Sequence, residues 1–149
     1  MKLSIERDEL LRALGRVQAI VERRGTMPIL ANVLIEARED GLTLAATDLE
    51  VAVIANHPAA VKTPGTVTLG AKKLFEIVRE LEGPEVVLGT EDGARVTLTC
   101  GPAKFSLLST SPEKVADLIV SGLAKGHEVV WAPGILQLAF GVFRILPSR

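Results

Sequence analysis

The sequence has a single cysteine, two histidines and no excess of charge of either sign. Cys100 alone cannot form an internal disulfide framework, and such sparse cysteine usage favours a reducing compartment. One cysteine and two well-separated histidines also do not supply the clustered ligands of a metal site. Seventeen basic and eighteen acidic residues leave a net charge of -1. Bulk attraction to nucleic acid is therefore excluded, and any such contact must come from locally clustered charge.

A long uninterrupted apolar segment and a secretory opening are also missing. The longest apolar stretch, residues 129–146, is interrupted by Pro133, Gly134 and Arg144, which argues against a membrane span. Met1 and Lys2 are followed at once by alternating and then charged residues, unlike a signal peptide. We therefore expect a soluble, cytoplasmic protein with no membrane partner.

Catalytic motifs are equally scarce. Cys100, His57 and Asp48 could be assembled into a nucleophile, a base and an orienting carboxylate, but no local signature surrounds them. No glycine-rich phosphate-binding loop of either common kind is found. The sequence therefore predicts no catalytic residue, no metal and no cofactor. An unrelated enzyme that uses Cys100 is the alternative from this class.

What the sequence does contain is the composition of a globular protein. About half of its 149 residues are apolar (48%) and about a quarter are charged (23%). This length suits one domain, or one domain followed by the beginning of a second.

The first part of the chain alternates between strand and helix patterns. Residues 2–5 alternate as a short strand, and a helix is expected over about 7–22. A loop over 23–30 follows. Three strands then come at 32–37, 42–46 and 51–55, of which the first two are joined by an Asp-Gly hairpin turn. The helix places one apolar stripe toward a core, made of Leu10, Leu14, Val17 and Val21 with Leu11 at its edge.

The same order of elements then repeats. A strand at 66–69 precedes a helix at 71–81, whose apolar face is Leu74, Ile77, Val78 and Leu81. Strands follow at 85–88, 95–99 and 103–108, and the Glu-Asp-Gly turn recurs at 91–93. This is an internal duplication of a βαβββ unit. It predicts an α+β domain over residues 1–110, with two helices packed on one face of antiparallel sheets.

The character of the chain changes after residue 110. A helix is expected to run from Ser111, as its N-cap, to about residue 120, and 122–126 then has the composition of a linker. From residue 129 onward only Arg144 and Arg149 are charged, and this apolar segment has no visible partner in the sequence. We interpret residues 111–149 as a linker and the truncated or diverged start of a second domain.

Basic residues gather on the polar faces of the two expected helices. They are Arg12, Arg16 and Arg23 along the first helix and Lys72 and Arg79 on the second. If both helices pack on the same side, these two stripes could follow a phosphate backbone without reading bases. An ordinary solvated helix face is the alternative reading, because the carboxylates of Glu9, Glu76 and Glu80 are close by in the sequence.

The chain also resembles the bacterial beta sliding clamp, the processivity subunit of DNA polymerase III. The resemblance rests on five blocks in the family's order and spacing, which are MKLSIER at 1–7, TMPILAN at 26–32, ATDLE at 46–50, AKKLF at 71–75 and KFSL at 104–107. The duplicated βαβββ unit is the family's domain plan as well.

The resemblance implies a DNA sliding clamp that encircles duplex DNA, catalyses nothing and needs no cofactor. Family members have three such domains and form a head-to-tail dimer, a ring whose helices line the hole. The implied partners are double-stranded DNA and other clamp subunits, in a homo-oligomer that needs the third domain. DNA polymerase III and the clamp loader are implied through the full-length family member.

By position, the resemblance assigns Arg24 and Lys72 to DNA contact. It assigns Phe105, Leu107 and Lys73 to the interface with the third domain of the other subunit. An edge strand with exposed apolar residues usually needs a partner, which gives the interface a physical basis.

The chain departs from the family in length, because the third domain and most of the second are missing. The alternative function is therefore a stand-alone clamp-domain module that binds a full-length clamp through 103–108 and modulates ring formation.

Overall fold

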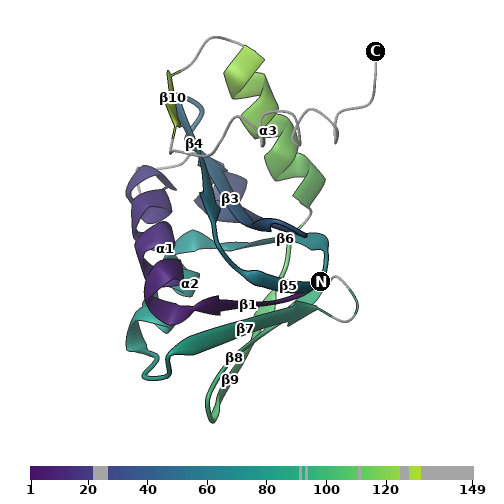
Figure 1. Ribbon diagram of the computed structural model, residues 1–149. Helices are drawn as coiled ribbons and strands as arrows, with labels where there is room; N and C mark the ends of the chain where they lie inside the picture. The colour runs from purple at the N-terminus through teal and green to yellow at the C-terminus, as the bar shows by residue number, and fades with distance from the viewer. Residues whose placement is uncertain (22–26, 91, 93, 111, 125–127, 132–149) are drawn as a thin grey trace.

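The computed structural model describes residues 1–21, 27–90, 92, 94–110, 112–124 and 128–131 (Figure 1). Its helices are α1 (Arg7–Val21), the short 3-10 helix η1 (Pro28–Ala31), α2 (Ala71–Glu80) and α3 (Pro112–Ala124). Its strands are β1 (Lys2–Glu6), β2 (Asn32–Arg38), β3 (Gly41–Thr47), β4 (Val51–His57), β5 (Ala60–Thr63), β6 (Gly65–Gly70), β7 (Glu85–Thr90), β8 (Arg95–Cys100), β9 (Ala103–Leu108) and β10 (Glu128–Trp131).

The described strands form two five-stranded sheets in which the repeated units exchange their first strands. One sheet has the order β5-β1-β7-β8-β9, and the other has the order β10-β4-β3-β2-β6. Thus β1, from the first unit, pairs with β7 of the second, with Leu3 opposite Leu88. In return β6 pairs with β2, with Val67 opposite Ile35. The α+β fold and the duplication are confirmed, but each sheet is built from both copies of the repeat.

Helices α1 and α2 lie together on one side of the two sheets (Figure 1). Their apolar faces join the inward side chains of both sheets in a single core cluster. The stripe predicted for α1 is confirmed, because Leu10, Leu14 and Val17 have 0% exposure. Both helices therefore turn their polar faces to the outside of the same half of the molecule, as the sequence predicted.

The corner between β3 and β4 holds a backbone conformation that is rare outside glycine. Leu49 has a φ of 79°, in the left-handed region. The Leu49 N–H donates to Thr47 Oγ1 at 3.0 Å. The Asp48 carboxylate accepts hydrogen bonds from the backbone N–H groups of Glu50 and Val51, at 2.9 and 2.7 Å. These side-chain hydrogen bonds hold the turn, which explains why this corner of the chain is polar.

Within residues 1–110, two elements were not predicted from the sequence. Residues 28–31, expected to lie in a loop, form the helix η1, which begins at Pro28 because a proline suits the first helical turn. The strand β5 lies between Pro58 and Pro64 and is mostly exposed, so it carries no alternating pattern. It is held as a strand by its pairing with β1, a contact between distant parts of the chain.

The expectations for the C-terminal region need two corrections. The proposed linker at 122–126 was wrong for its first residues, because α3 continues to Ala124, and Gly122 weakens a helix without ending it. Strand β10 pairs in parallel with β4, so Glu128–Trp131 does have a partner within the chain. Residues 132–149 and the proposed N-cap Ser111 lie outside the described residues.

Helix α3 covers the outer face of the sheet that contains β2, β3 and β4. Its Val115, Ala116 and Ile119 are buried against Leu34, Ala45 and Ile54 in a second, smaller cluster. The hydroxyl of Thr68, on β6 of the same sheet, is buried without a hydrogen-bond partner among the described residues. The part of this outer face beneath α3 is therefore largely apolar and covered, in contrast to the polar faces of α1 and α2.

Candidate nucleic-acid and subunit interfaces

The exposed faces of α1 and α2 carry most of the predicted basic residues. Arg12 and Arg16 are exposed on α1, and Lys72 and Arg79 are exposed on α2. The two helices contact one another, and a Cβ added to Gly15 would lie 3.6 Å from the ring of Phe75. The basic residues therefore lie on the exposed faces of two helices that pack against each other. Arg23 and Arg24, which were also predicted for it, lie outside the described residues.

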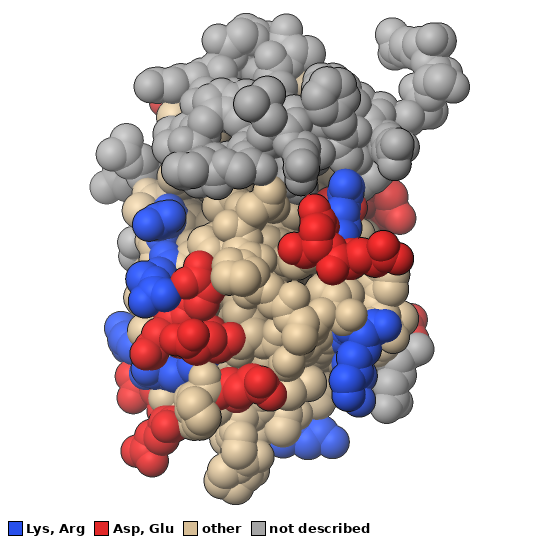
Figure 2. All heavy atoms as spheres, in the orientation of Figure 1, with Lys and Arg blue, Asp and Glu red and all other residues tan. Residues whose placement is uncertain are grey.

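Carboxylates neutralise part of this surface. Arg12 donates to Glu9 Oε2 at 2.6 Å, and Arg79 donates to Glu80 Oε1 at 3.2 Å. The guanidinium of Arg79 also lies 5.8 Å from the centre of the Phe75 ring. In Figure 2, acidic and basic side chains are intermixed along the flank where α1 lies. Within the part of the chain that the structure describes, Arg16 and Lys72 form no ion pair, so they are the cations available to an outside anion.

Glu9 connects the polar face of α1 to the end of β4. Its Oε1 lies 2.6 Å from Nδ1 of the buried His57, and its Oε2 accepts the hydrogen bond from Arg12. The hydrogen bond with His57, followed by that with Arg12, lowers the pKa of Glu9 below its ordinary value of 4.5. Glu9 is therefore ionised at neutral pH and orients Arg12 on the helix face.

Arg7 fixes the relative position of α1 and α2, a role that the sequence analysis missed. Its Nε donates to the carbonyl oxygen of Val78 at 3.2 Å, and its NH2 donates to that of Arg79 at 2.6 Å. These carbonyls belong to the last turn of α2, where helical N–H groups run out. The Val78 carbonyl also accepts a hydrogen bond from the backbone N–H of Leu81, the C-cap residue, at 3.3 Å. A cation here also interacts favourably with the helix dipole. Arg7 thereby joins the start of α1 to the end of α2.

Strand β9 is the last strand of its sheet in the described structure, with one edge unpaired. Phe105 is 37% exposed, and Leu108 is 70% exposed. Leu107 is half-buried beside the core. Two of the predicted interface residues thus lie on an open edge, and Leu108, which was not predicted, is the most exposed large apolar side chain described. Apolar residues are common in strands that are paired on both sides, so the sequence alone does not show that these residues are exposed. Their exposure follows from the position of β9 at the edge of the sheet.

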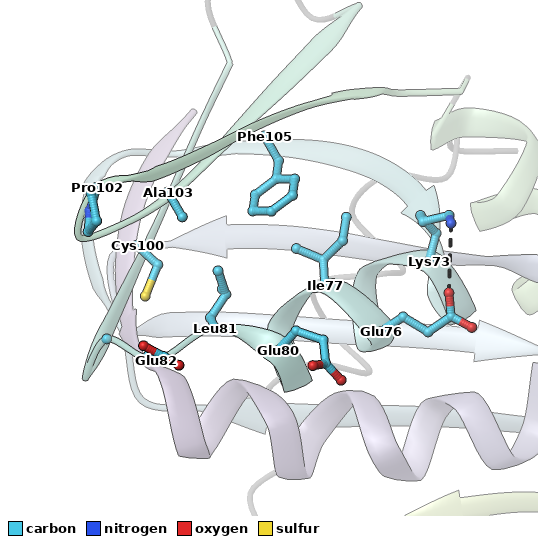
Figure 3. Close-up of a pocket in the computed structure, with 11 residues that line it drawn as sticks. Lys73, Glu76, Ile77, Glu80, Leu81, Glu82, Cys100, Pro102, Ala103 and Phe105 are labelled. Atoms are coloured by element: carbon cyan, nitrogen blue, oxygen red, sulfur yellow. Dashed lines mark ion pairs between the residues drawn. The ribbon is translucent and has the colours of Figure 1, made fainter.

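A groove of about 470 Å³ runs between α2 and the β8–β9 hairpin (Figure 3). Apolar side chains line its inner part, and Phe105 extends from β9 toward Ile77 across it. Lys73, the third predicted interface residue, lies at one end, 3.7 Å from Glu76. Glu82 lies toward the other end, on the side of Pro102 and Cys100, and Glu80 lies between the two ends, at the last turn of α2. The groove is thus apolar inside, with the Lys73–Glu76 ion pair at one end and Glu82 toward the other.

The residues considered for catalysis are not brought together. Cys100 ends β8 in one sheet, whereas His57 ends β4 in the other and contacts Glu9. Asp48 uses its carboxylate to hold the β3–β4 corner. Among the described residues there is no group of three or more His, Cys, Asp or Glu that could hold a metal ion. In the same part of the chain, no helix has the length and apolar character needed to cross a membrane.

Comparisons with known proteins agree with this architecture. The family model described as the DNA polymerase III beta subunit, N-terminal domain, matches residues 1–118. The beta sliding clamp of Caulobacter vibrioides (strain NA1000 / CB15N) is 46% identical over 109 residues, which are 72% of this chain and 29% of the relative. The beta sliding clamp of Escherichia coli (strain K12) is 40% identical over 115 residues, which are 75% of this chain and 31% of the relative.

Solved structures give the same result. The chain matches Caulobacter crescentus pol III beta with a TM-score of 0.70 and 38% identity, covering 90% of this chain and 33% of that one. It matches the DNA polymerase sliding clamp of Bacillus subtilis with a TM-score of 0.73 and 25% identity, covering 76% of this chain and 32% of that one. The chain therefore spans about a third or less of the length of these relatives.

Proposed function

Because the chain belongs to the DNA polymerase III beta subunit family, whose N-terminal domain it contains, we propose that it serves DNA replication as the first domain of a sliding clamp that encircles duplex DNA. The family is non-catalytic, so the function is one of binding. The match to the family model over residues 1–118, together with 46% identity to one beta sliding clamp over 109 residues, is the observation that carries this proposal. The partners we propose are duplex DNA, other clamp subunits in the cytoplasm, and the polymerase and clamp loader through a complete clamp.

In this proposal the polar faces of α1 and α2 meet the DNA. Arg16 and Lys72 contact phosphates directly, since they are exposed and have no ion pair among the described residues. Arg12 and Arg79 contribute less because Glu9 and Glu80 neutralise them. Arg23 and Arg24 are proposed contacts from their place in the sequence. A few weak phosphate contacts suit sliding, because tight or base-specific contacts would stop it.

The test is the affinity of the double variant Arg16→Ala with Lys72→Ala for duplex DNA. Fluorescence anisotropy at low salt measures this affinity. We expect the variant to bind more weakly, and the wild-type affinity to fall as salt rises. The matched control is Lys2→Ala with Lys62→Ala, which removes the same charge from exposed positions on β1 and β5. Equal weakening by both variants would mean that net charge alone matters, and would contradict the assignment to α1 and α2.

The open edge of β9 supports a second candidate function. We propose that this strand, through Phe105 and Leu107 and together with Lys73 of α2, binds the third domain of a clamp subunit. If this chain acts without further domains of its own, that contact would block ring closure. The test is retention of an isolated third clamp domain by the chain, with Phe105→Asp as the variant. Failure of the wild-type chain to retain that domain would remove the candidate.

A further inference from the structure

We propose that Glu9 attenuates DNA contact: His57 holds its carboxylate in the position where it pairs with Arg12 and keeps that guanidinium from a phosphate. This role rests on the proposed function, since it sets how strongly the faces of α1 and α2 hold duplex DNA. The effect is opposite to that of Arg16 and Lys72, because Glu9 lowers the affinity for DNA that these cations raise.

His57 is fixed by the sheet to which it belongs. It is buried at the end of β4, opposite Leu42 of β3. Gly41, with a φ of 139°, lies so close that an added Cβ would be 2.6 Å from the His57 carbonyl oxygen. Nδ1 lies 2.6 Å from Glu9 Oε1, whereas Nε2 is buried without a hydrogen-bond partner among the described residues. Within that part of the chain, Glu9 is therefore the hydrogen-bond partner of an imidazole that has little room to move.

Glu9 is thus held on one side by His57 and paired on the other with Arg12. Its Oε2 accepts a hydrogen bond from Arg12, three residues further along α1, at 2.6 Å. The side chain of Glu9 is 22% exposed, whereas that of Arg12 is 62% exposed. An ion pair on a helix surface usually contributes little, because two long side chains lose freedom when it forms. Since His57 already restricts Glu9, pairing here restricts only Arg12.

The ion pair of Arg79 on α2 lacks such an anchor. Arg79 pairs with Glu80 at 3.2 Å, but the Glu80 side chain is 76% exposed, and Arg79 is its hydrogen-bond partner within the described residues. A carboxylate this exposed swings away easily when a phosphate approaches its arginine. Glu9 stays beside Arg12 because His57 holds it. A phosphate that approaches Arg12 therefore competes with a fixed carboxylate.

The consequence for DNA follows from charge. Glu9 is ionised at neutral pH, so the Glu9–Arg12 pair has no net charge and its carboxylate repels phosphates. Arg16 lies four residues beyond Arg12, on the same face of α1. Without the charge of Glu9, Arg12 would join Arg16 in contacting the phosphate backbone. With it, the contact made by α1 stays weak, as sliding requires.

The test compares Glu9→Gln with the wild-type chain in duplex binding, measured by fluorescence anisotropy at neutral pH over a range of salt concentrations. Glutamine keeps the size of glutamate and an oxygen for His57, but it removes the charge that holds Arg12. We expect the affinity to rise about two- to fivefold. The slope of log affinity against log salt should steepen by about 0.9, the value for one added phosphate contact. Circular dichroism establishes beforehand that each variant is folded at the assay temperature.

Arg12→Ala decides whether the gain passes through Arg12. In the wild-type chain this substitution should lower the affinity by less than about twofold, because Glu9 already occupies the guanidinium. In the Glu9→Gln chain it should remove most of the gain, so the two substitutions are not additive. Equal effects of Arg12→Ala in both backgrounds would overturn the proposal, since Glu9 would then act on DNA without Arg12.

Glu6→Gln and Glu39→Gln are the matched controls for charge. After Glu9, the charge of Glu6 also raises the pKa of Arg12, so Glu6 is a nearby carboxylate that acts across space. Glu39 is exposed in the β2–β3 turn. Each control removes one negative charge and should raise the affinity less than Glu9→Gln does. Equal gains from all three variants would show that net charge alone matters, and would overturn the role of Glu9.

His57 is tested as a positioning residue by two substitutions. His57→Leu removes the contact with Glu9 and should reproduce part of the gain in affinity, because Glu9 is then free to leave Arg12. His57→Asn keeps an amide nitrogen near the place of Nδ1 and should retain the wild-type affinity and salt slope. Wild-type affinity in a folded His57→Leu chain would overturn the role of His57. If that variant does not fold, Glu9→Gln and its combination with Arg12→Ala still decide the proposal.

The outcomes separate this role from the proposed function. Duplex binding that depends on Arg16 and Lys72 but is unchanged in Glu9→Gln would overturn attenuation and leave the DNA-contact surface in place. A lack of duplex binding in both the wild-type and the Glu9→Gln chain would overturn both.

Discussion

At the residue scale, the β3–β4 corner depends on Asp48. Its carboxylate accepts two backbone hydrogen bonds, from Glu50 and Val51. Asp48→Ala removes the acceptor of these two N–H groups, of which that of Glu50 is exposed to water, and should lower the free energy of unfolding by about 1 kcal/mol. Urea unfolding followed by circular dichroism measures this change. Asp40→Ala, in the exposed β2–β3 turn, is the control and should have little effect. Equal stability of the two variants would argue against the role of Asp48.

Glu9 gives the folded state a dependence on pH. Its pKa is lowered from the ordinary value of 4.5 by hydrogen bonds from His57 and then Arg12. A carboxylate with a depressed folded-state pKa stabilises the fold above its ordinary pKa, and this contribution is lost as the pH falls through the folded-state value. We therefore expect the free energy of unfolding to decrease below about pH 4.5 and the decrease to be smaller in Glu9→Gln.

The measurement is urea unfolding at a series of pH values from neutral to acid. Glu39→Gln, an exposed carboxylate in the β2–β3 turn, removes the same charge and should keep the wild-type dependence. An identical pH profile for Glu9→Gln and the wild-type chain would show that the contact with His57 does not stabilise the fold.

At the scale of the elements, α1 connects the core, because its buried face packs against α2 and both sheets. It contacts α2 and both sheets, and Leu14 lies at the centre of its buried face with 0% exposure. Leu14→Ala removes a fully buried side chain and should lower the free energy of unfolding by roughly 2–5 kcal/mol. Arg16→Ala, on the exposed face of the same helix, should change stability much less. An unaltered thermal midpoint for Leu14→Ala would contradict the assignment of the buried face.

At the scale of the whole molecule, the exchange of β1 and β6 makes the two repeated units interdependent. Each sheet needs a strand from the other unit, and the two helices share one core. A fragment of residues 1–64 and a fragment of residues 65–149 should therefore each lack stable structure alone. When mixed, they should recover the circular dichroism spectrum of the intact chain. A fragment that folds cooperatively by itself would mean that the units are independent.

The sequence alone determined much of the fold and part of the candidate site. Apolar periodicity determined α1 and α2 and their buried faces, because a helix repeats every 3.6 residues whatever it packs against. It thereby predicted correctly that Arg12, Arg16, Lys72 and Arg79 are exposed, since these residues lie opposite that face. The repeated turns and strands predicted the βαβββ duplication, because these signals are local.

The tertiary structure decided what depends on distant contacts. The exchange of β1 and β6, the strand β5 and the parallel pairing of β10 follow from which strands meet, and no local pattern encodes this choice. The role of Arg7 and the neutralisation of Arg12 likewise depend on where carbonyls and carboxylates lie in space. Phe105 and Leu108 are ordinary strand residues in the sequence. They are available to a partner because β9 is the last strand of its sheet, where its backbone groups and apolar side chains face outward.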